Sequence, residues 1–256
     1  MKKIVSALLS MFILITFTAC LSSQDNKTKN SFIKNESNLD VVSIQQIKLE
    51  NKPNILFTVT ADASLKHIYS TVDEFNKSDA VDTIVKGTIT NIEYVYVSGL
   101  AYSILTINVL QSYKGNCAKT IKVYEDGGYV KVKDKLDELK KHIDVEKLTQ
   151  EQIDNGVIDI KFFNAPHAKK GQQVILYLTK NIAPLPTDSY RIVSSLYGKF
   201  TLDKSDEMYK RIALDTKDDT ITNNKESENS SKIDLVTNFE KEISESDMEY
   251  KLTNLK

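Results

Sequence analysis

The chain has 256 residues, of which 41% are hydrophobic and 27% charged, and its formal net charge is −1. This composition excludes global disorder and lacks the basic surplus of a nucleic-acid-binding protein, so we expect no nucleic-acid partner. The length suits one medium-sized domain with short appendages.

The N-terminal segment has the features of an export signal. Lys2 and Lys3 precede an uncharged apolar stretch that ends at Phe17-Thr18-Ala19-Cys20. The stretch is too short to be a spanning helix and is typical of a secretory signal peptide. Its end resembles the bacterial lipobox, although Phe17 stands where that motif prefers Leu. The resemblance implies that residues 1–19 are removed and that Cys20 carries lipid (palmitate among the acyl groups), which would anchor the chain to the cell membrane, facing outside the cytoplasm.

Residues 20–38 are polar and predict a flexible tether. A globular β-rich domain is expected over residues 39–214. It opens with β-like runs at 39–49 and 55–60. Apolar residues at helical spacing then predict a helix that begins at Asp62 or Ser64 and ends near residue 76. These residues are Leu65, Ile68, Val72 and Phe75.

The clearest β region lies between residues 82 and 132. Val85, Gly87 and Ile89 alternate on one face, and the apolar residues from Ile92 onward alternate in the opposite phase. This change of phase predicts a bulge near residues 90–91. Later strands are predicted at 105–113, 121–123 and 129–132, separated by turns at Ser98-Gly99, Lys114-Gly115-Asn116 and Asp126-Gly127-Gly128.

The hydrophobic period then changes. Residues 132–143 predict an amphipathic helix, and residues 148–153 a shorter one. Strands are predicted at 157–163, 174–179 and 190–202, the last with a kink at Gly198.

The C-terminal part reads differently from the domain. Residues 215–232 are polar and predict a linker. Residues 233–256 then predict a C-terminal helix, because Ile233, Val236, Phe239 and Ile243 recur at helical spacing. This helix either docks on the domain or serves a partner.

The order of elements predicts an α+β fold that is mostly β. We expect an OB-like five-stranded, partly open barrel at about residues 81–202, with an inserted helical segment. The alternative is an open antiparallel sheet with helices on one face. The stretch also resembles exported Gram-positive proteins and, through them, netrin-like OB barrels. The matching residues are Asp82–Ile89, Tyr113-Lys114-Gly115, Lys170–Leu178 and Tyr197-Gly198-Lys199-Phe200. The chain lacks the cysteines of netrin-like inhibitors, so no inhibitory residue is carried over.

The sequence contains no nucleophile elbow, zinc-protease motif or phosphate-binding loop, so no catalytic, metal-binding or cofactor-binding residue is assigned. His67, His142 and His167 are far apart and are interpreted as independent surface residues. Cys117 is unpaired once Cys20 is lipidated, and it is interpreted as a small residue beside a turn.

Tyrosines give a weaker indication of binding. Five of them lie on or beside the first three strands of the expected barrel, and strands two and three of an OB fold form its usual ligand face. These candidate ligand-face residues are Tyr94, Tyr96, Tyr102, Tyr113 and Tyr124. The leading hypothesis is a non-catalytic envelope lipoprotein that binds a protein or glycan. The alternatives are an envelope hydrolase with an unrecognised site and a protease-inhibitor-like module.

Overall fold

The computed structural model describes residues 44–47, 53–61, 65, 68–180, 182, 185–186, 188–212 and 239–255. They belong to a single unit that spans residues 43–256. The expected signal segment, Cys20, the tether, the linker and His67 lie outside the described residues. No helix among the described residues has the length and apolar character needed to cross a membrane.

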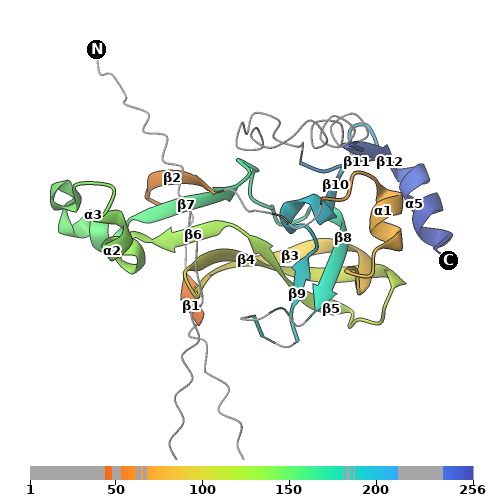
Figure 1. The fold of residues 1–256 in the computed structure, drawn as a ribbon, viewed down its shortest axis with the longest axis horizontal. Helices are drawn as coiled ribbons and strands as arrows, with labels where there is room; N and C mark the ends of the chain where they lie inside the picture. The colour runs from red at the N-terminus through yellow and green to blue at the C-terminus, as the bar shows by residue number, and fades with distance from the viewer. Residues whose placement is uncertain are drawn as a thin grey trace, which may run out of the picture. The chain divides into compact units, whose positions relative to one another are not determined.

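The fold is mostly β, as predicted, and its strands form one large mixed sheet and one small sheet (Figure 1). The large sheet has the order β1-β3-β4-β5-β9-β8-β10-β11-β12. Its strands are β1 (Ile44–Ile47), β3 (Thr83–Val97), β4 (Leu100–Lys114), β5 (Thr120–Asp126), β8 (Gln173–Lys180), β9 (Tyr190–Ile192), β10 (Lys199–Asp203), β11 (Met208–Lys210) and β12 (Glu242–Ser244).

Five strands of the large sheet close on themselves. β3 pairs with β8 as well as with β4, so hydrogen-bonded neighbours run β3-β4-β5-β9-β8 and back to β3. The pairing of β5 with β9 is parallel and the other pairings in this ring are antiparallel. We call these five strands the strand ring. Its parallel pair means that the sheet is mixed and differs from the purely antiparallel alternative.

The long β3–β4 hairpin follows the predicted pattern. Its turn is Ser98-Gly99, with φ of 49° and 86°. The register shifts between Ile89 and Asn91, which confirms the predicted bulge. Before the bulge, Gly87 is buried where β3 closely approaches β4. A Cβ atom there would lie 2.4 Å from Ile107 Cγ2 and 2.8 Å from the Asn108 carbonyl oxygen. The alternation therefore identifies the inward face correctly, and glycine permits the close approach of β3 to β4.

Two apolar cores lie on opposite faces of the ring strands β3 and β8. The first joins side chains of all five ring strands with Ala168: Val85, Ile89, Leu105, Ile107, Ile121, Val123, Ala168, Val174, Leu176, Leu178, Tyr190 and Ile192. The second core joins β3, β8, β10 and β11 to the two helices α1 (Val72–Lys77) and α5 (Glu245–Thr253). Burial of these apolar side chains is the main favourable term that holds the ring and the helices together.

The helices that cover the second core are shorter than predicted. α1 begins at Val72, where the Thr71 hydroxyl accepts the Glu74 N–H, and residues 65 and 68–71 are not helical. In the C-terminal part, Ile243 belongs to β12, which pairs with β11, and the helix begins only at Glu245. Strand pairing overrides the local helical spacing here. Met248 and Leu252 are buried, so α5 docks on its own domain.

Polar contacts fix α5 and the C-terminal chain in place. Lys86 Nζ lies 3.0 Å from Glu245 Oε1, and Tyr113 donates to Glu249 at 2.6 Å. Burial raises the pKa of Glu249, but hydrogen bonds from Lys86 and Tyr113 outweigh it and hold this pKa below its ordinary value. The buried Arg211 donates to the backbone carbonyls of residues 69, 70 and 240, and burial lowers its pKa to about 10.

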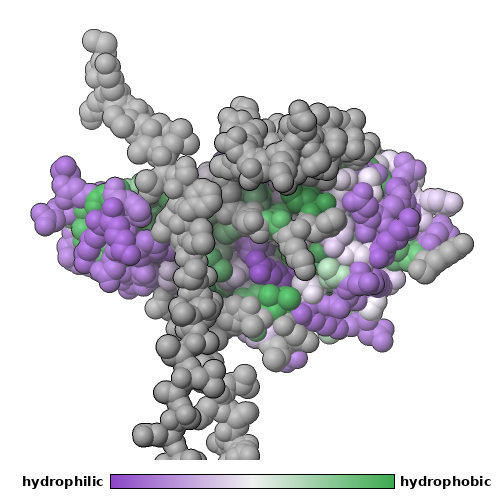
Figure 2. Space-filling model, in the orientation of Figure 1, coloured by the Kyte–Doolittle hydropathy of each residue, from purple (hydrophilic) through white to green (hydrophobic). Residues whose placement is uncertain are grey.

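A second sheet combines β6 and β7, which come between the ring strands β5 and β8 in the chain, with β2, which precedes β3. It has the order β2-β7-β6, with β2 parallel and β6 antiparallel to β7. The predicted helix at 132–143 is two short pieces in the structure, and Figure 2 shows hydrophilic residues gathered over the insert. The elements are β2 (Ile55–Ala61), β6 (Gly128–Lys131), η1 (Val132–Lys135), α2 (Leu136–Leu139), η2 (Val145–Lys147), α3 (Gln150–Asn155) and β7 (Val157–Phe162).

The last predicted strand, at 190–202, is interrupted. Ser194 and Ser195 have φ of 55° and 54°, and a short 3₁₀ helix, η3 (Ser195–Gly198), separates β9 from β10. Left-handed backbone cannot continue a strand, so the chain changes direction here.

We predict that Gly87→Val lowers the free energy of unfolding by about 1–3 kcal/mol, because the added side chain would collide with Ile107 and with the backbone of Asn108 on β4. Chemical denaturation measures the change. Thr88→Val, at the neighbouring half-buried position, is the matched control and should keep wild-type stability. Equal stability of the Gly87 variant and the control would contradict the close approach of β3 to β4 at Gly87.

Candidate functional site

A pair of glycines carries the chain from the strand ring into the second sheet. Gly127 and Gly128 follow β5 with φ of 95° and 147°, values that favour glycine. The Ser103 hydroxyl donates to the Gly127 carbonyl at 2.9 Å. A Cβ atom on Gly128 would lie 3.1 Å from Tyr94 Cδ1 and 3.2 Å from Ser103 Oγ. The predicted turn at Asp126-Gly127-Gly128 thus brings β6 across the ends of β3 and β4.

Buried and half-buried charged and polar side chains gather around this crossing. We call them the junction cluster: Tyr94, Glu125, Asp126, Tyr129, Asp159, His167, Arg191, Ser195 and Lys199.

Two adjacent buried carboxylates end β5, and each has a cationic partner. Glu125 accepts from Lys199 Nζ at the start of β10. Asp126 accepts from Arg191 Nη2 on β9, at 2.9 and 3.1 Å to its two oxygens, and from the Ser195 hydroxyl. Glu125 is 3% exposed and Lys199 is 8% exposed. A buried carboxylate without a partner is strongly unfavourable, so these contacts are required by the burial itself.

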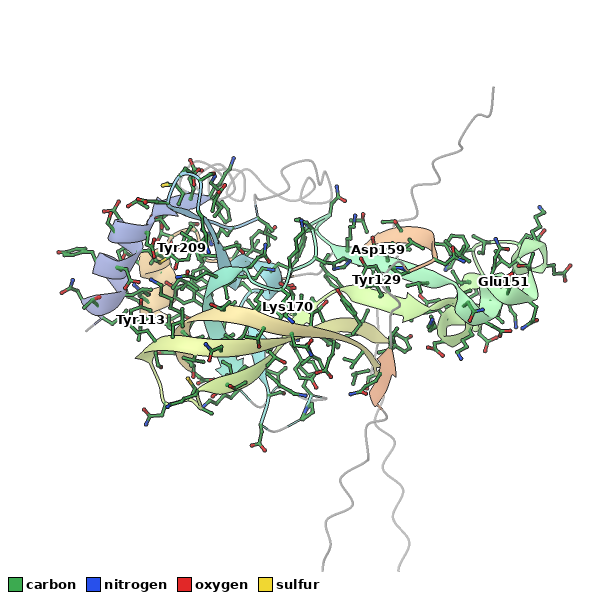
Figure 3. All side chains as sticks on the ribbon, turned by 180° about the vertical axis from the view of Figure 1, so that it is seen from behind. Tyr113, Tyr129, Glu151, Asp159, Lys170 and Tyr209 are labelled. Carbon is green, nitrogen blue, oxygen red and sulfur yellow. The ribbon has the colours of Figure 1, made fainter. Side chains whose placement is uncertain are left out.

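The third carboxylate is on the second sheet. Asp159 lies on β7, 5% exposed, with its Oδ1 2.6 Å from His167 Nε2. His167 comes from the loop after Pro166, and its ring centroid is 4.8 Å from that of Tyr129. Tyr129 is the cross-strand neighbour of Asp159, and Figure 3 shows these two side chains together on the insert. His167 is therefore part of a buried network and is not the independent surface residue that we predicted.

Tyr94 connects the two halves of the cluster. Its ring centroid is 4.8 Å from that of Tyr129. Burial, then the charges of Tyr129, Glu125 and Asp159, raise the pKa of Tyr94 to about 12. The Tyr94 ring centroid also lies 6.3 Å from that of His167, so Tyr94, a residue of the ring strand β3, contacts both aromatic members of the second-sheet half.

The five tyrosines proposed as a ligand face are not brought together. Tyr102 and Tyr124 are only 2% and 4% exposed, and their rings contact each other edge to face. Tyr113 donates to Glu249 of α5, and Figure 3 shows it near the end of the domain that carries α5, well away from Tyr129. Tyr94 and Tyr96 are half-buried near β6 and Lys135.

The remaining candidates are separate from the cluster. His142 is exposed, as predicted for a surface histidine. Cys117 is half-buried, packs against the first apolar core and is a free thiol. Within the part of the chain that is described, no three His, Cys, Asp or Glu side chains converge as metal ligands.

Sequence reasoning missed the junction cluster, although one signal was present. The chain has only two arginines, Arg191 and Arg211, among many lysines. Arginine is the usual choice for buried ion pairs and fixed multidentate hydrogen bonding. In the structure one arginine binds Asp126 and the other binds three backbone carbonyls.

The arrangement could support acid–base chemistry at one place. A histidine hydrogen-bonded to a buried carboxylate is the orienting part of many hydrolytic sites. The two buried serines of the crossing, however, donate elsewhere: Ser103 to the Gly127 carbonyl and Ser195 to Asp126. The described contacts therefore give the His167–Asp159 pair no serine nucleophile. Comparison with protein-family models, curated proteins and solved structures finds no match to this chain.

We predict that Lys199→Met lowers the free energy of unfolding by about 3–5 kcal/mol, because it leaves the Glu125 carboxylate buried and unpaired. The double variant Lys199→Met, Glu125→Leu should recover most of this loss, since an apolar pair replaces the ion pair. Thermal and chemical denaturation measure both. Lys210→Met breaks two ion pairs, with Asp203 and Asp206, between more exposed side chains and should have little effect. An unrecovered double variant would show that Lys199 acts through something other than Glu125.

Proposed function

We propose that this chain is a lipid-anchored cell-envelope protein that faces outside the cytoplasm and binds a protein or glycan partner without catalysis. The observation that carries the anchor is the N-terminal sequence: a basic start, a short uncharged apolar stretch and Ala19-Cys20. The membrane contact would be the lipid on Cys20.

We further propose that the strand ring is an OB-type barrel. Five strands in the order β3-β4-β5-β9-β8 close through the pairing of β3 with β8, which supports this interpretation. The strands β6 and β7 and the helices between them enter between β5 and β8, the third and fourth ring strands in chain order, where OB barrels commonly carry a helix. The fold leaves the ligand open, because OB barrels serve many unrelated functions.

The outer face of β4 and β5 is the binding surface that this interpretation favours. Their inward residues fill the first apolar core, so the residues between them face outward. Asn108 and Lys122 are exposed there, and Leu110 is 55% exposed. An apolar side chain with polar neighbours suits contact with a protein or a glycan better than catalysis. By the same alternation Tyr102 and Tyr124 lie on this face, where their rings contact each other and are buried.

The hydrolase alternative has one observation in its favour, the His167–Asp159 pair. It ranks second because the buried carboxylates of the junction cluster are each bound to a cation or a histidine. The protease-inhibitor-like alternative depends on the ring topology alone.

We predict that a fatty-acid probe labels the wild-type chain in growing cells and does not label Cys20→Ala. The reason is that Cys20 supplies the only thiol at the expected cleavage site. Cys117→Ser is the matched control and should label like the wild type. Equal labelling of wild type and Cys20→Ala would overturn the anchor.

A photo-crosslinking residue at position 110 should capture a discrete partner in intact cells, because Leu110 lies on the proposed binding face. The same residue at Tyr250, which is 72% exposed on α5, is the control and should not capture that species. Asp159→Asn should leave the capture unchanged. Loss of a measurable envelope hydrolase activity in a folded Asp159→Asn variant would favour the enzymatic alternative.

A further inference from the structure

The second sheet ends in the longest terminal strand among the described residues. β2 has seven residues, whereas the other terminal strands β1, β6 and β12 have four, four and three. Among the described strands, β2 pairs with β7 and with no other (Figure 1). The outer side of such a strand presents backbone N–H and C=O groups that can pair with another strand.

β2 also lacks the side chains that usually prevent such pairing. Its sequence, Ile-Leu-Phe-Thr-Val-Thr-Ala, contains no charge and no proline. Ile55 and Val59 are 43% and 42% exposed, and they are two of the five exposed large apolar residues in the described chain. The one irregularity of the pairing with β7 lies between Ile55 and Phe57, so the backbone from Phe57 to Ala61 is regular.

The strand is complementary to itself. In an antiparallel pair of two β2 strands centred on Thr58, Phe57 faces Val59 of the other copy and Leu56 faces Thr60. Aromatic residues opposite β-branched ones are favourable cross-strand pairs, and no like charges meet. A two-fold axis requires this kind of self-complementary patch.

We propose that two copies of this chain associate through β2, which joins their second sheets into one six-stranded sheet. Self-association goes beyond the proposed binding function and does not depend on it. The pairing covers Ile55 and Val59, and it gives each three-stranded sheet the more usual number of strands. Anchors in one membrane plane would strengthen the pairing by raising the effective concentration of the two strands.

Disulfide trapping tests the register in the full chain. In a Cys117→Ser background, Thr58→Cys places two thiols opposite each other at the two-fold axis, within the Cα separation that a disulfide needs. Thr60→Cys is the matched control, since both threonines are exposed on the same strand. The two thiols introduced by the control would lie roughly 13 Å apart along the strands, too far for a disulfide. We expect a crosslinked dimer from Thr58→Cys and none from Thr60→Cys after mild oxidation.

Val59→Lys gives an independent measurement, because it places a charge at the pairing edge opposite Phe57. Sedimentation should show a dimer for the Cys117→Ser chain and a monomer for the same chain with Val59→Lys. Absence of the Thr58→Cys dimer, equal yields at both positions, or an unchanged mass for Val59→Lys would each overturn the proposal.

The same experiment separates this proposal from the lipid anchor. A disulfide dimer in the Cys117→Ser chain without an introduced cysteine would report a free Cys20 thiol and so contradict lipidation. The two threonine variants would then be compared again with Cys20→Ser added to each. We would still expect a disulfide dimer from Thr58→Cys and none from Thr60→Cys.

Discussion

The buried carboxylates of Glu125 and Asp126 impose the strongest constraint on this fold. Neither can stay ionised inside the domain without a cation, and the cations come from late in the chain. Arg191 is 65 residues from Asp126, and Lys199 is 74 residues from Glu125. Satisfying both pairs requires β9, η3 and β10 to return to the end of β5. The parallel β5–β9 pairing that completes the strand ring is therefore coupled to charge compensation as well as to apolar burial.

The same place in the chain determines how the second sheet is attached. Gly127 and Gly128 allow β6 to cross β3 and β4 so closely that Ser103 binds the Gly127 carbonyl. This crossing packs Tyr129 against Tyr94. The pairing of β6 with β7 places Asp159 opposite Tyr129, and His167 is hydrogen-bonded to Asp159. The polar centre thus lies where the two sheets meet, and its paired charges suit a structural joint better than a reaction centre.

Local sequence patterns predicted the strands well and the helices poorly. The alternation about Gly87, the bulge after Ile89 and the turn at Ser98-Gly99 follow from neighbouring residues, and the structure confirms them. The helix expected from Leu65 begins only at Val72, and Ile243 pairs in a strand despite its helical spacing, because tertiary contacts decide marginal helices. The junction cluster could not be predicted from the sequence, since no local pattern shows that Asp126 faces Arg191. The scarcity of arginine was the only sequence feature that indicated it.

Ring closure also determines where this chain can use its backbone for recognition. Each of the five ring strands has a neighbour on both sides, so the terminal strands of the two described sheets, β1, β12, β2 and β6, lie outside the ring. β12 is short, carries Glu242 and leads directly into α5, and β6 carries Lys131 and lies over β3 and β4. Among these terminal strands, only β2 is seven residues long and carries no charged residue. The proposed backbone pairing is therefore assigned to β2, and the proposed side-chain contacts to the outer face of β4 and β5.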